Sequence, residues 1–223
     1  MPWSEVAGRK RNRLQVDERR EQLLELGIRL FSDRSYEEIP IGEIAEAAGI
    51  SKGLLYHYFP SKRDFYVEAV RHAAGQMLSS IEQATQGPDR GEVEGLRRGL
   101  DAYLDYVEDH AVAYSTLMKS GAADPDVALV VEQARGTFVL QISEGAGLLA
   151  PSPTVRVALR GWIGFVEAAS LEWLETRAVA RTALREVMVA ALMGAAQAAA
   201  MDLNDGVTAD LTPKPKKSAR GRS

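Results

Sequence analysis

The sequence predicts an all-α protein of about nine helices. Apolar residues recur at helical spacing along most of the chain, and no strand pattern, internal repeat or low-complexity tract occurs before residue 205. Breaks rich in Gly and Pro divide the chain at 86–91 (QGPDRG) and 151–153 (PSP). A hydrophobic content of 46% in 223 residues is enough for an ample core. We therefore expect an N-terminal three-helix domain followed by a larger helical domain.

The composition limits the possible functions. The chain has no Cys, which excludes disulfides, thiolate metal sites and cysteine nucleophiles. No long uncharged apolar run occurs, and residues 1–20 lack the apolar stretch of a signal peptide. We expect a cytoplasmic protein without membrane contact. The net charge is −4, but the excess of acidic residues lies between residues 73 and 210, and both ends of the chain are neutral or basic.

Residues 1–15 are expected to form a flexible basic arm, because they lack an apolar period and carry Pro2 and Gly8 among several bases. The bases are Arg9, Lys10, Arg11 and Arg13. Two interpretations stay open. Such an arm can reach nucleic-acid phosphates or a minor groove, or it can be a solvated terminus with no defined contact.

Residues 16–72 are expected to form the first domain. Its first helix runs from about residue 16 to residue 32 and places polar residues on one side. The other side is apolar and consists of Leu23, Leu26, Ile28, Leu30 and Phe31. This helix is expected to support the two short helices that follow it.

The stretch from Ile41 to Lys62, IGEIAEAAGISKGLLYHYFPSK, predicts two short helices joined by a tight turn. Gly49 tolerates the positive φ of a sharp helix exit, and Ser51 supplies a hydroxyl N-cap for the second helix. This pattern is typical of a helix-turn-helix, whose second helix can enter a DNA major groove. The buried face of the first helix has the spacing i, i+3, i+4, i+7 and consists of Ile41, Ile44, Ala45 and Ala48.

The second short helix carries the candidate DNA contacts. We expect Tyr56 and His57 to face bases or nearby phosphates, because both side chains form hydrogen bonds. Leu54, Leu55 and Phe59 are expected to anchor this helix on the helix of residues 16–32. The predicted DNA-binding residues are Ser51, Lys52, Gly53, Tyr56, His57, Tyr58 and Lys62.

The run from about Leu23 to Phe65 closely resembles the N-terminal domain of the TetR family of bacterial transcriptional regulators. It joins an IAxxAG turn, an SKGxLYxYF recognition segment and a PSK helix start, in order and without gaps. The resemblance implies that the basic and phenolic residues Lys52, Tyr58 and Lys62 contact phosphates. The chain departs from the family at Pro40. The family often has Ser or Thr there to cap the helix and touch a phosphate, whereas Pro can start a helix but has no hydroxyl.

Residues 73–205 are expected to form the second domain, and residues 206–223 a disordered basic tail. A long helix from Lys62 to about Thr85, capped by Ser61, connects the two domains. Further helices are expected at Val93–Asp109, His110–Ser120, Pro125 to about Leu149, Thr154–Arg177 and Arg181–Leu203.

The last of these helices predicts self-association. Val187–Met201 (VMVAALMGAAQAAAM) has no charged residue and many small ones, so it must be buried over most of its surface, within its own domain or against a second copy. In the TetR family the last two long helices form a four-helix bundle with those of a partner, and the resemblance implies a homodimer of that kind. A two-fold dimer also places two recognition helices about one turn of DNA apart.

Aromatic and apolar residues of the second domain are candidates for a small-molecule pocket, because such pockets have apolar walls and a few polar groups. The resemblance implies an effector site in this domain. The alternative is that these residues belong to an ordinary core or interface. A buried Glu167 or Glu172 could select a cationic group. The candidate residues are Tyr103, Tyr106, Met118, Phe138, Trp162 and Phe165.

We expect no enzyme activity, cofactor or metal. His57, His72 and His110 show no HExxH or paired metal spacing, and no GxSxG, Walker or dinucleotide-binding motif occurs.

The predicted function is a ligand-responsive repressor that binds a palindromic operator as a homodimer and is released by a small apolar or amphipathic effector. One alternative is a constitutive architectural DNA-binding protein without an inducer. Another is an apolar-ligand-binding or enzymatic protein with a vestigial helix-turn-helix.

Overall fold

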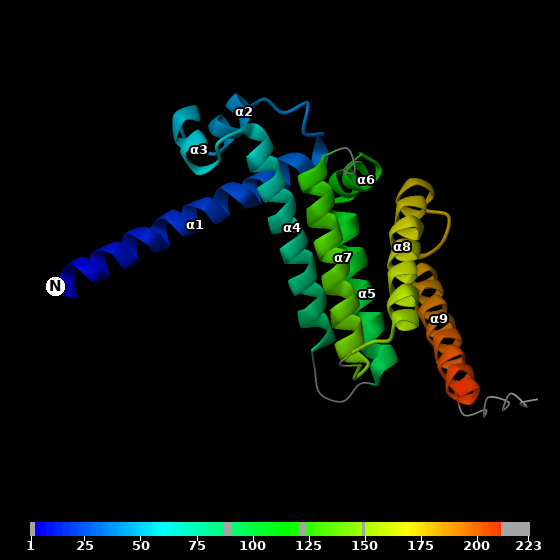
Figure 1. Cartoon of the computed structure of the whole chain (residues 1–223). Coiled ribbons are helices and arrows are strands. Elements are labelled where there is room, and N and C mark those ends of the chain that lie inside the picture. The colour runs from blue at the N-terminus through cyan, green and yellow to red at the C-terminus, as the bar shows by residue number, and fades with distance from the viewer. Residues whose placement is uncertain (1–2, 87–90, 121–123, 149, 211–223) are drawn as a thin grey trace, which may run out of the picture.

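The computed structural model describes residues 3–86, 91–120, 124–148 and 150–210, and every regular element in these ranges is an α-helix (Figure 1). The predicted all-α class is therefore confirmed. The helices are α1 (Trp3–Asp33), α2 (Ile41–Ala47), α3 (Lys52–Tyr58), α4 (Lys62–Thr85), α5 (Glu92–Asp109), α6 (Ala111–Ser120), α7 (Pro125–Gly145), α8 (Pro153–Thr176) and α9 (Arg181–Asp210).

The N-terminal domain consists of α1, α2, α3 and the first turns of α4, which enclose one core. Phe65 of α4 lies at its centre and is fully buried. The rings of Phe59 and Phe65 meet edge to face with their centroids 4.9 Å apart, a favoured aromatic geometry. Leu23, Ile44 and Leu55 bring α1, α2 and α3 onto the same core. The apolar spacing in the sequence therefore describes the faces that are buried here.

Helix α1 is longer than the sequence predicts. It begins at Trp3, so the backbone of residues 3–15, predicted as a flexible arm, continues the helix away from the rest of the molecule (Figure 1). The reason is that no proline occurs from residue 3 to residue 33, so every N–H is free to join the helical hydrogen bonds. Residues 1 and 2 of the predicted arm lie outside the described residues.

Replacing Gly27 with alanine is expected to destabilise the N-terminal domain. A Cβ at this position would lie 2.7 Å from Cζ of the buried Phe65 ring, where α1 crosses α4. Overpacking of this kind costs about 1–3 kcal/mol of unfolding free energy, which urea denaturation measures. Gly75→Ala on α4 is the matched control, because a Cβ there meets no atom within 4 Å. It is expected to stabilise the helix by about 0.5–1 kcal/mol, and equal effects of the two changes would contradict the close approach.

The helix boundaries follow local signals in the sequence. The Ser61 hydroxyl accepts a hydrogen bond from the backbone N–H of Asp64 at 3.0 Å, and α4 ends at Thr85 as predicted. Helix α9 continues past Leu203, so residues 206–210 of the predicted tail are helical. The remainder of that tail, residues 211–223, lies outside the described residues.

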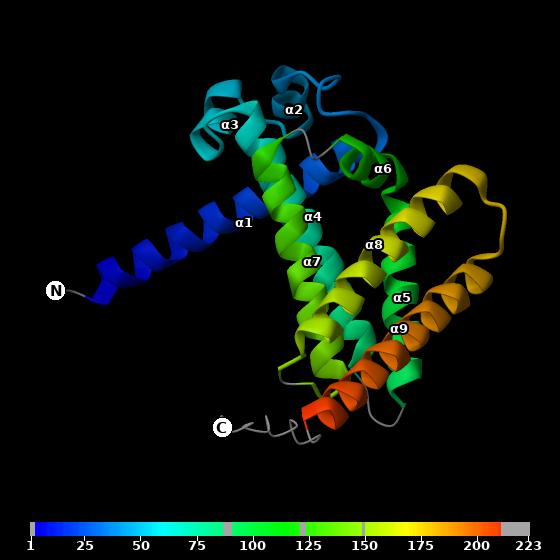
Figure 2. The ribbon, with the colours of Figure 1, turned by 45° about the vertical axis from the view of Figure 1, so that its right-hand side comes forward.

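In the second domain, α4, α5 and α7 run alongside one another, and α8 and α9 pack beside them (Figures 1 and 2). Leu104 and Val107 of α5 and Met188 of α9 are fully buried in its core. The indole N–H of Trp162 on α8 donates a hydrogen bond to the backbone carbonyl of Met188 at 2.8 Å. This bond joins the last two helices to each other.

Candidate nucleic-acid interface and ligand cavity

The α2–α3 pair has the geometry of a helix-turn-helix. Gly49 has a φ of +63°, which allows the chain to leave α2 sharply. The backbone N–H of Ile50 donates to the carbonyl of Ala45 at 3.0 Å and closes the turn. The Ser51 hydroxyl then accepts a hydrogen bond from the N–H of Leu54 at 3.1 Å and caps α3. Pro40 precedes α2 and makes no side-chain cap, as its chemistry predicts.

Helix α3 divides into a buried and an exposed face. Leu55 and Phe59 are buried in the N-terminal core, as predicted for anchors. Leu54 is 42% exposed and does not anchor the helix, because successive helical residues are turned by about 100°. The exposed face contains most of the predicted DNA contacts and consists of Ser51, Lys52, Gly53, Leu54, Tyr56 and His57.

The remaining predicted contacts lie at the edge of this face. Tyr58 is half-buried and packs against the N-terminal core, so its ring also has a structural role. The ammonium of Lys62 lies 4.2 Å from the ring centroid of Tyr36, a cation–π contact. The phosphate contacts of Tyr58 and Lys62 stay predictions.

Two arginines of α1 hold the pair in place, and the sequence pattern does not reveal them. Nη2 of Arg19 donates to the carbonyl of Ala48 at 3.0 Å, at the end of α2. Arg20 forms an ion pair with Glu68 of α4 at 3.0 Å, and its guanidinium lies 5.1 Å from the Phe59 ring centroid. Burial favours a higher pKa for Glu68, but the hydrogen bonds and charges of the neighbouring arginines outweigh it and lower the pKa.

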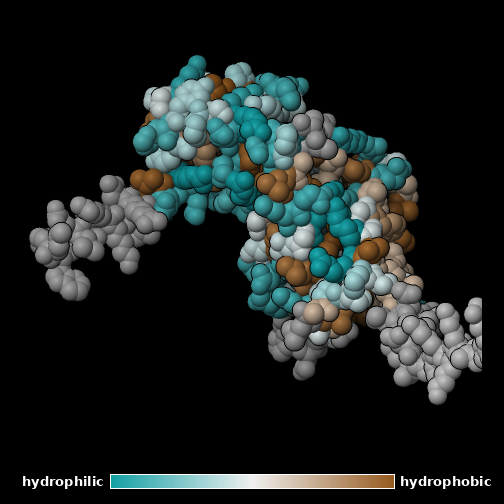
Figure 3. All heavy atoms as spheres, in the orientation of Figure 1, coloured by the Kyte–Doolittle hydropathy of each residue, from teal (hydrophilic) through white to brown (hydrophobic). Residues whose placement is uncertain are grey.

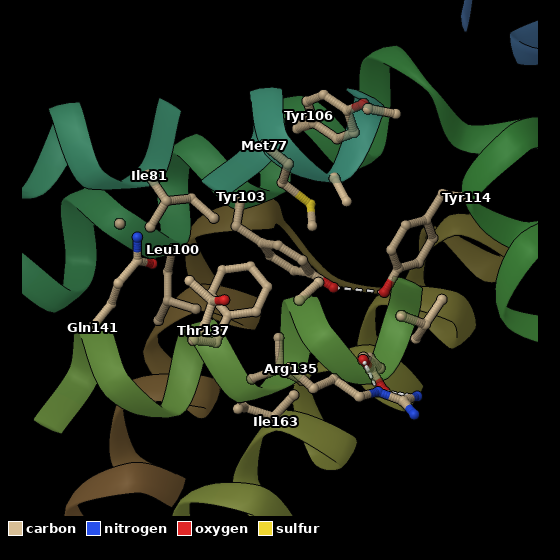
Figure 4. A pocket seen from close by; sticks show the side chains of 18 of the residues that line it. Met77, Ile81, Leu100, Tyr103, Tyr106, Tyr114, Arg135, Thr137, Gln141 and Ile163 are labelled. Atoms are coloured by element: carbon tan, nitrogen blue, oxygen red, sulfur yellow. Dashed lines mark hydrogen bonds and ion pairs between the residues drawn. The ribbon is translucent and has the colours of Figure 1, made fainter. Parts of the chain in front are cut away.

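The second domain contains a cavity of about 850 Å³ between α4, α5, α7 and α8 (Figure 4). Phe165 was predicted to line it but is 38% exposed and lies outside it. Its neighbour Val166 faces the interior, and one helical step turns Phe165 outward. The other predicted residues do line the cavity, namely Tyr103, Tyr106, Met118, Phe138 and Trp162.

Three tyrosines, Tyr103, Tyr106 and Tyr114, contribute hydroxyl groups to the wall of the cavity. The hydroxyls of Tyr103 and Tyr114 are 2.6 Å apart and buried, and Figure 4 shows them meeting. Burial raises the pKa of Tyr103 to about 12 and also raises that of Tyr114. Tyr106 stacks on His110 with the ring centroids 4.2 Å apart, and burial raises its pKa to about 12. All three phenols are therefore uncharged at neutral pH.

Glu167 lines the cavity, but it is already paired. Nε and Nη2 of Arg135 donate to its two carboxylate oxygens at 2.8 Å and 2.6 Å. Such a fork-to-fork pair neutralises both charges. Glu167 therefore has no free carboxylate with which to select a cationic ligand, the role that the sequence suggested for it. Glu172, the other candidate for that role, is exposed and not buried.

The cavity also reaches the N-terminal domain. Its lining includes Phe31 of α1, Tyr36 of the α1–α2 connection and Tyr66 of α4. The rings of Tyr36 and Tyr66 lie with their centroids 4.7 Å apart. A molecule that fills this end of the cavity would therefore touch the domain that carries α3.

A polar contact joins the start of α4 to the start of α7. Arg63 donates to both oxygens of Asp124 at 2.8 Å and to Asp126 at 2.7 Å. The carboxylate of Asp124 also caps α7 by accepting the N–H of Asp126 at 2.9 Å. The hydrogen bond from Arg63 is the main cause that lowers the pKa of Asp124. The Arg63–Asp124 contact therefore stays charged at neutral pH.

Among the described residues, no group of three or more His, Cys, Asp or Glu side chains is arranged to hold a metal ion. Within the same ranges no helix is both long and apolar enough to cross a bilayer.

Comparison with known proteins places this geometry in a family. Residues 23–69 match the family of bacterial regulatory proteins named tetR, and residues 93–195 match the tetracyclin repressor-like, C-terminal domain. A crystal structure of a tetR-family transcriptional regulator from Streptomyces coelicolor is 31% identical, with a TM-score of 0.75 over 91% of this chain and 92% of that one.

Curated relatives match over shorter stretches. The HTH-type transcriptional activator FasR of Mycolicibacterium smegmatis is 33% identical over 127 residues, which span 56% of this chain and 58% of that protein. The HTH-type transcriptional repressor KstR2 of Mycobacterium tuberculosis is 42% identical over 57 residues, which span 26% and 28%. Together with the helix-turn-helix geometry, these similarities show that the chain belongs to the TetR family of DNA-binding transcriptional regulators.

Proposed function

We propose that the protein is a homodimeric, ligand-responsive repressor of the cytoplasm that binds a palindromic operator and is released by a small apolar or amphipathic effector. The main support for this proposal is a cavity that extends from the second domain to Phe31, Tyr36 and Tyr66 of the DNA-binding domain. An effector there would contact the elements that position α3. The effector causes release of DNA if it binds more tightly to a conformation of the protein that does not fit the operator than to the one that does.

The exposed face of α3 supports the DNA-binding part. Tyr56 and His57 are exposed on the free side of a capped helix, where they can reach base edges or phosphates. Lys52 and Lys62 would bind phosphates, with Ser51, Gly53 and Tyr58 at the same surface. Contacts of the N-terminal part of α1 with DNA would steepen the salt dependence of binding.

The outer faces of α8 and α9 support the dimer. Figure 3 shows hydrophobic residues gathered over these helices. Val157, Gly161 and Phe165 are exposed on α8, and Val187, Ala190 and Gly194 on α9, at spacings that place each set on one side of its helix. An exposed apolar surface with small residues fits close packing against the same two helices of a second copy. A two-fold dimer presents two copies of α3, and its operator is therefore palindromic.

The walls of the cavity support an apolar or amphipathic effector. They consist mostly of aliphatic and aromatic side chains, and the tyrosines are neutral. The Arg135–Glu167 pair leaves no net charge at that point of the wall. A strongly polar molecule would lose its hydration without enough partners in such a space.

Selection of bound DNA from a random pool at two salt concentrations tests the proposal. A palindromic site whose affinity falls steeply with salt is expected. Salt-sensitive binding without an enriched site would favour the architectural alternative, and absence of binding would contradict a DNA-binding role. A reporter gene behind the selected site decides the sign of regulation, and repression is expected.

Replacing Arg63 with methionine is expected to reduce the coupling between effector and operator. The change removes the contact of α4 with Asp124 and Asp126 at the start of α7. Coupling between two ligands is typically about 5–150-fold in affinity, and here it should fall several-fold towards one. The measurement is operator affinity with and without effector. Arg71→Met is the control, because Arg71 pairs with Glu68 within α4. Unchanged coupling in the Arg63 variant would show that this contact does not contribute to the coupling between effector and operator.

A pH dependence follows from the same contact. Because Arg63 lowers the pKa of Asp124, this carboxyl stabilises the fold at pH values above its ordinary pKa of about 3.9. The contribution is lost as the pH falls through the lower folded value. A pH series of thermal unfolding should show less acid destabilisation for Arg63→Met than for the unchanged protein in that range.

A further inference from the structure

Arg98 differs from the other arginines that line the cavity. Arg34 pairs with Glu43, and Arg135 pairs with Glu167. Arg98 instead donates from Nε to the carbonyl of Ala84 at 2.8 Å and from Nη2 to the carbonyl of Thr85 at 3.4 Å. No carboxylate among the described residues forms an ion pair with it. Among the described residues, backbone carbonyls at the end of α4 are the groups that accept its hydrogen bonds.

One nitrogen of this guanidinium has no acceptor. Nη1 of Arg98 is buried and forms no hydrogen bond. A buried charged donor without an acceptor is costly, and such groups in native structures call for a partner. The position lies where the cavity reaches the surface, because Glu82 and Thr85 line the same end and are exposed. The carboxylate of Glu82, which lines the same end, accepts a hydrogen bond from the Gln86 amide at 3.2 Å.

A second unpaired group lies on the opposite wall. Oε1 of Gln141 on α7 is buried and has no hydrogen-bond partner. Figure 4 shows the Gln141 amide directed to Ile81 of α4, one turn before the carbonyls that Arg98 contacts. An amide can present either its oxygen or its nitrogen by rotating about its last bond, so Gln141 can donate to an acidic group.

We propose that Arg98 and Gln141 bind the anionic head group of an amphipathic effector at this end of the cavity. The head group accepts hydrogen bonds from Nη1 of Arg98 and from the Gln141 amide. The apolar tail then extends past Leu100 and Met77 towards Tyr103, and in that direction lies the DNA-binding domain. This proposal deepens the proposed function and depends on it, because it names the chemical class of the effector. A carboxylate at the end of an alkyl chain has the required chemistry.

The test compares three probes with the same alkyl chain: dodecanoate, dodecanol and dodecyltrimethylammonium. Binding to the protein is followed by tryptophan fluorescence, because Trp162 lines the cavity, and by calorimetry. A charge-assisted hydrogen bond in a partly buried site is expected to make dodecanoate bind at least about tenfold more tightly than dodecanol, with the cationic probe weakest. This comparison uses the unaltered protein and needs no variant to fold.

Variants then locate the head group. Arg98→Met should reduce the affinity for dodecanoate to about that for dodecanol, and Gln141→Leu should weaken it by about threefold without disturbing the end of α4. Arg97→Met is the matched control, because the neighbouring Arg97 pairs with Glu186 and does not line the cavity. Thermal unfolding accompanies each variant, since Arg98 also holds the last carbonyls of α4.

Three results would overturn the proposal: equal affinity for the three probes, preference for dodecanoate that survives Arg98→Met, or no binding of any probe. The proposed function is tested separately, because selection of an operator site needs no alkyl probe. If a palindromic operator is selected but the three probes bind equally well, the protein is still a DNA-binding regulator, and only the anionic class of effector is excluded.

Discussion

Replacing Val187 with glutamate is expected to separate the dimer into monomers and to weaken operator binding by at least about 100-fold, the order of gain that joining two binding modules supplies. Val187 is 55% exposed on α9, in a stretch without charged residues. At a two-fold interface each change occurs twice, and a carboxylate buried there without a partner costs several kcal/mol. Sedimentation velocity measures the dimer, and gel-shift titration of the selected operator measures the affinity.

Val112→Glu is the matched control for this change. Val112 is 47% exposed on α6, a helix that packs mainly against α1, so the same substitution introduces the same charge outside α8 and α9. It should leave the dimer and the operator affinity unchanged. If Val187→Glu stayed dimeric at the concentrations used for DNA binding, the last helix would not form the interface.

Replacing both Tyr56 and His57 with alanine is expected to abolish recognition of the operator while leaving weak, salt-sensitive DNA binding. Each lost base contact should cost about 1–3 kcal/mol, or about 5–150-fold in affinity per residue. The lysines that contact phosphates remain, so the salt dependence of non-specific binding should change little. Fold stability should also be kept, because both side chains are exposed.

His72→Ala serves as the comparison for the recognition helix. His72 lies on α4 beside Gln76, with the ring nitrogen 3.3 Å from the Gln76 amide, away from the exposed face of α3. Wild-type affinity of the double variant for the selected site would mean that Tyr56 and His57 face neither bases nor phosphates. Lys52 and the exposed Leu54 would then be the next residues to replace.

Local features of the sequence determined the helix-turn-helix. Gly49 acts by adopting a positive φ, and Ser51 and Ser61 act by capping the helices that follow them. These effects reach only a few residues along the chain, so they can be predicted without knowledge of the fold. The buried faces of α2 and α3 follow from helical periodicity in the same way. The start of α4 at Lys62 and its end at Thr85 were predicted for that reason. The family resemblance also rests on this contiguous stretch.

Contacts between distant segments were decided by the tertiary structure. Arg135 and Glu167 are 32 residues apart, and Arg63 and Asp124 are 61 residues apart, and no pattern in the sequence pairs them. The same holds for Arg98, which forms no ion pair with a carboxylate of the described residues and donates to the carbonyls of Ala84 and Thr85 instead.

The rotation of each helix about its own axis was also decided by packing. Leu54 and Phe165 are as apolar as their buried neighbours, yet each lies on an exposed face. Residue type alone does not state which side of a helix meets the core when apolar residues occupy more than one side. The sequence thus determined the helices, their caps and the helix-turn-helix, because those depend on short-range interactions. The cavity and the unpaired Nη1 of Arg98 depend on the fold, because they arise where helices far apart in the chain meet.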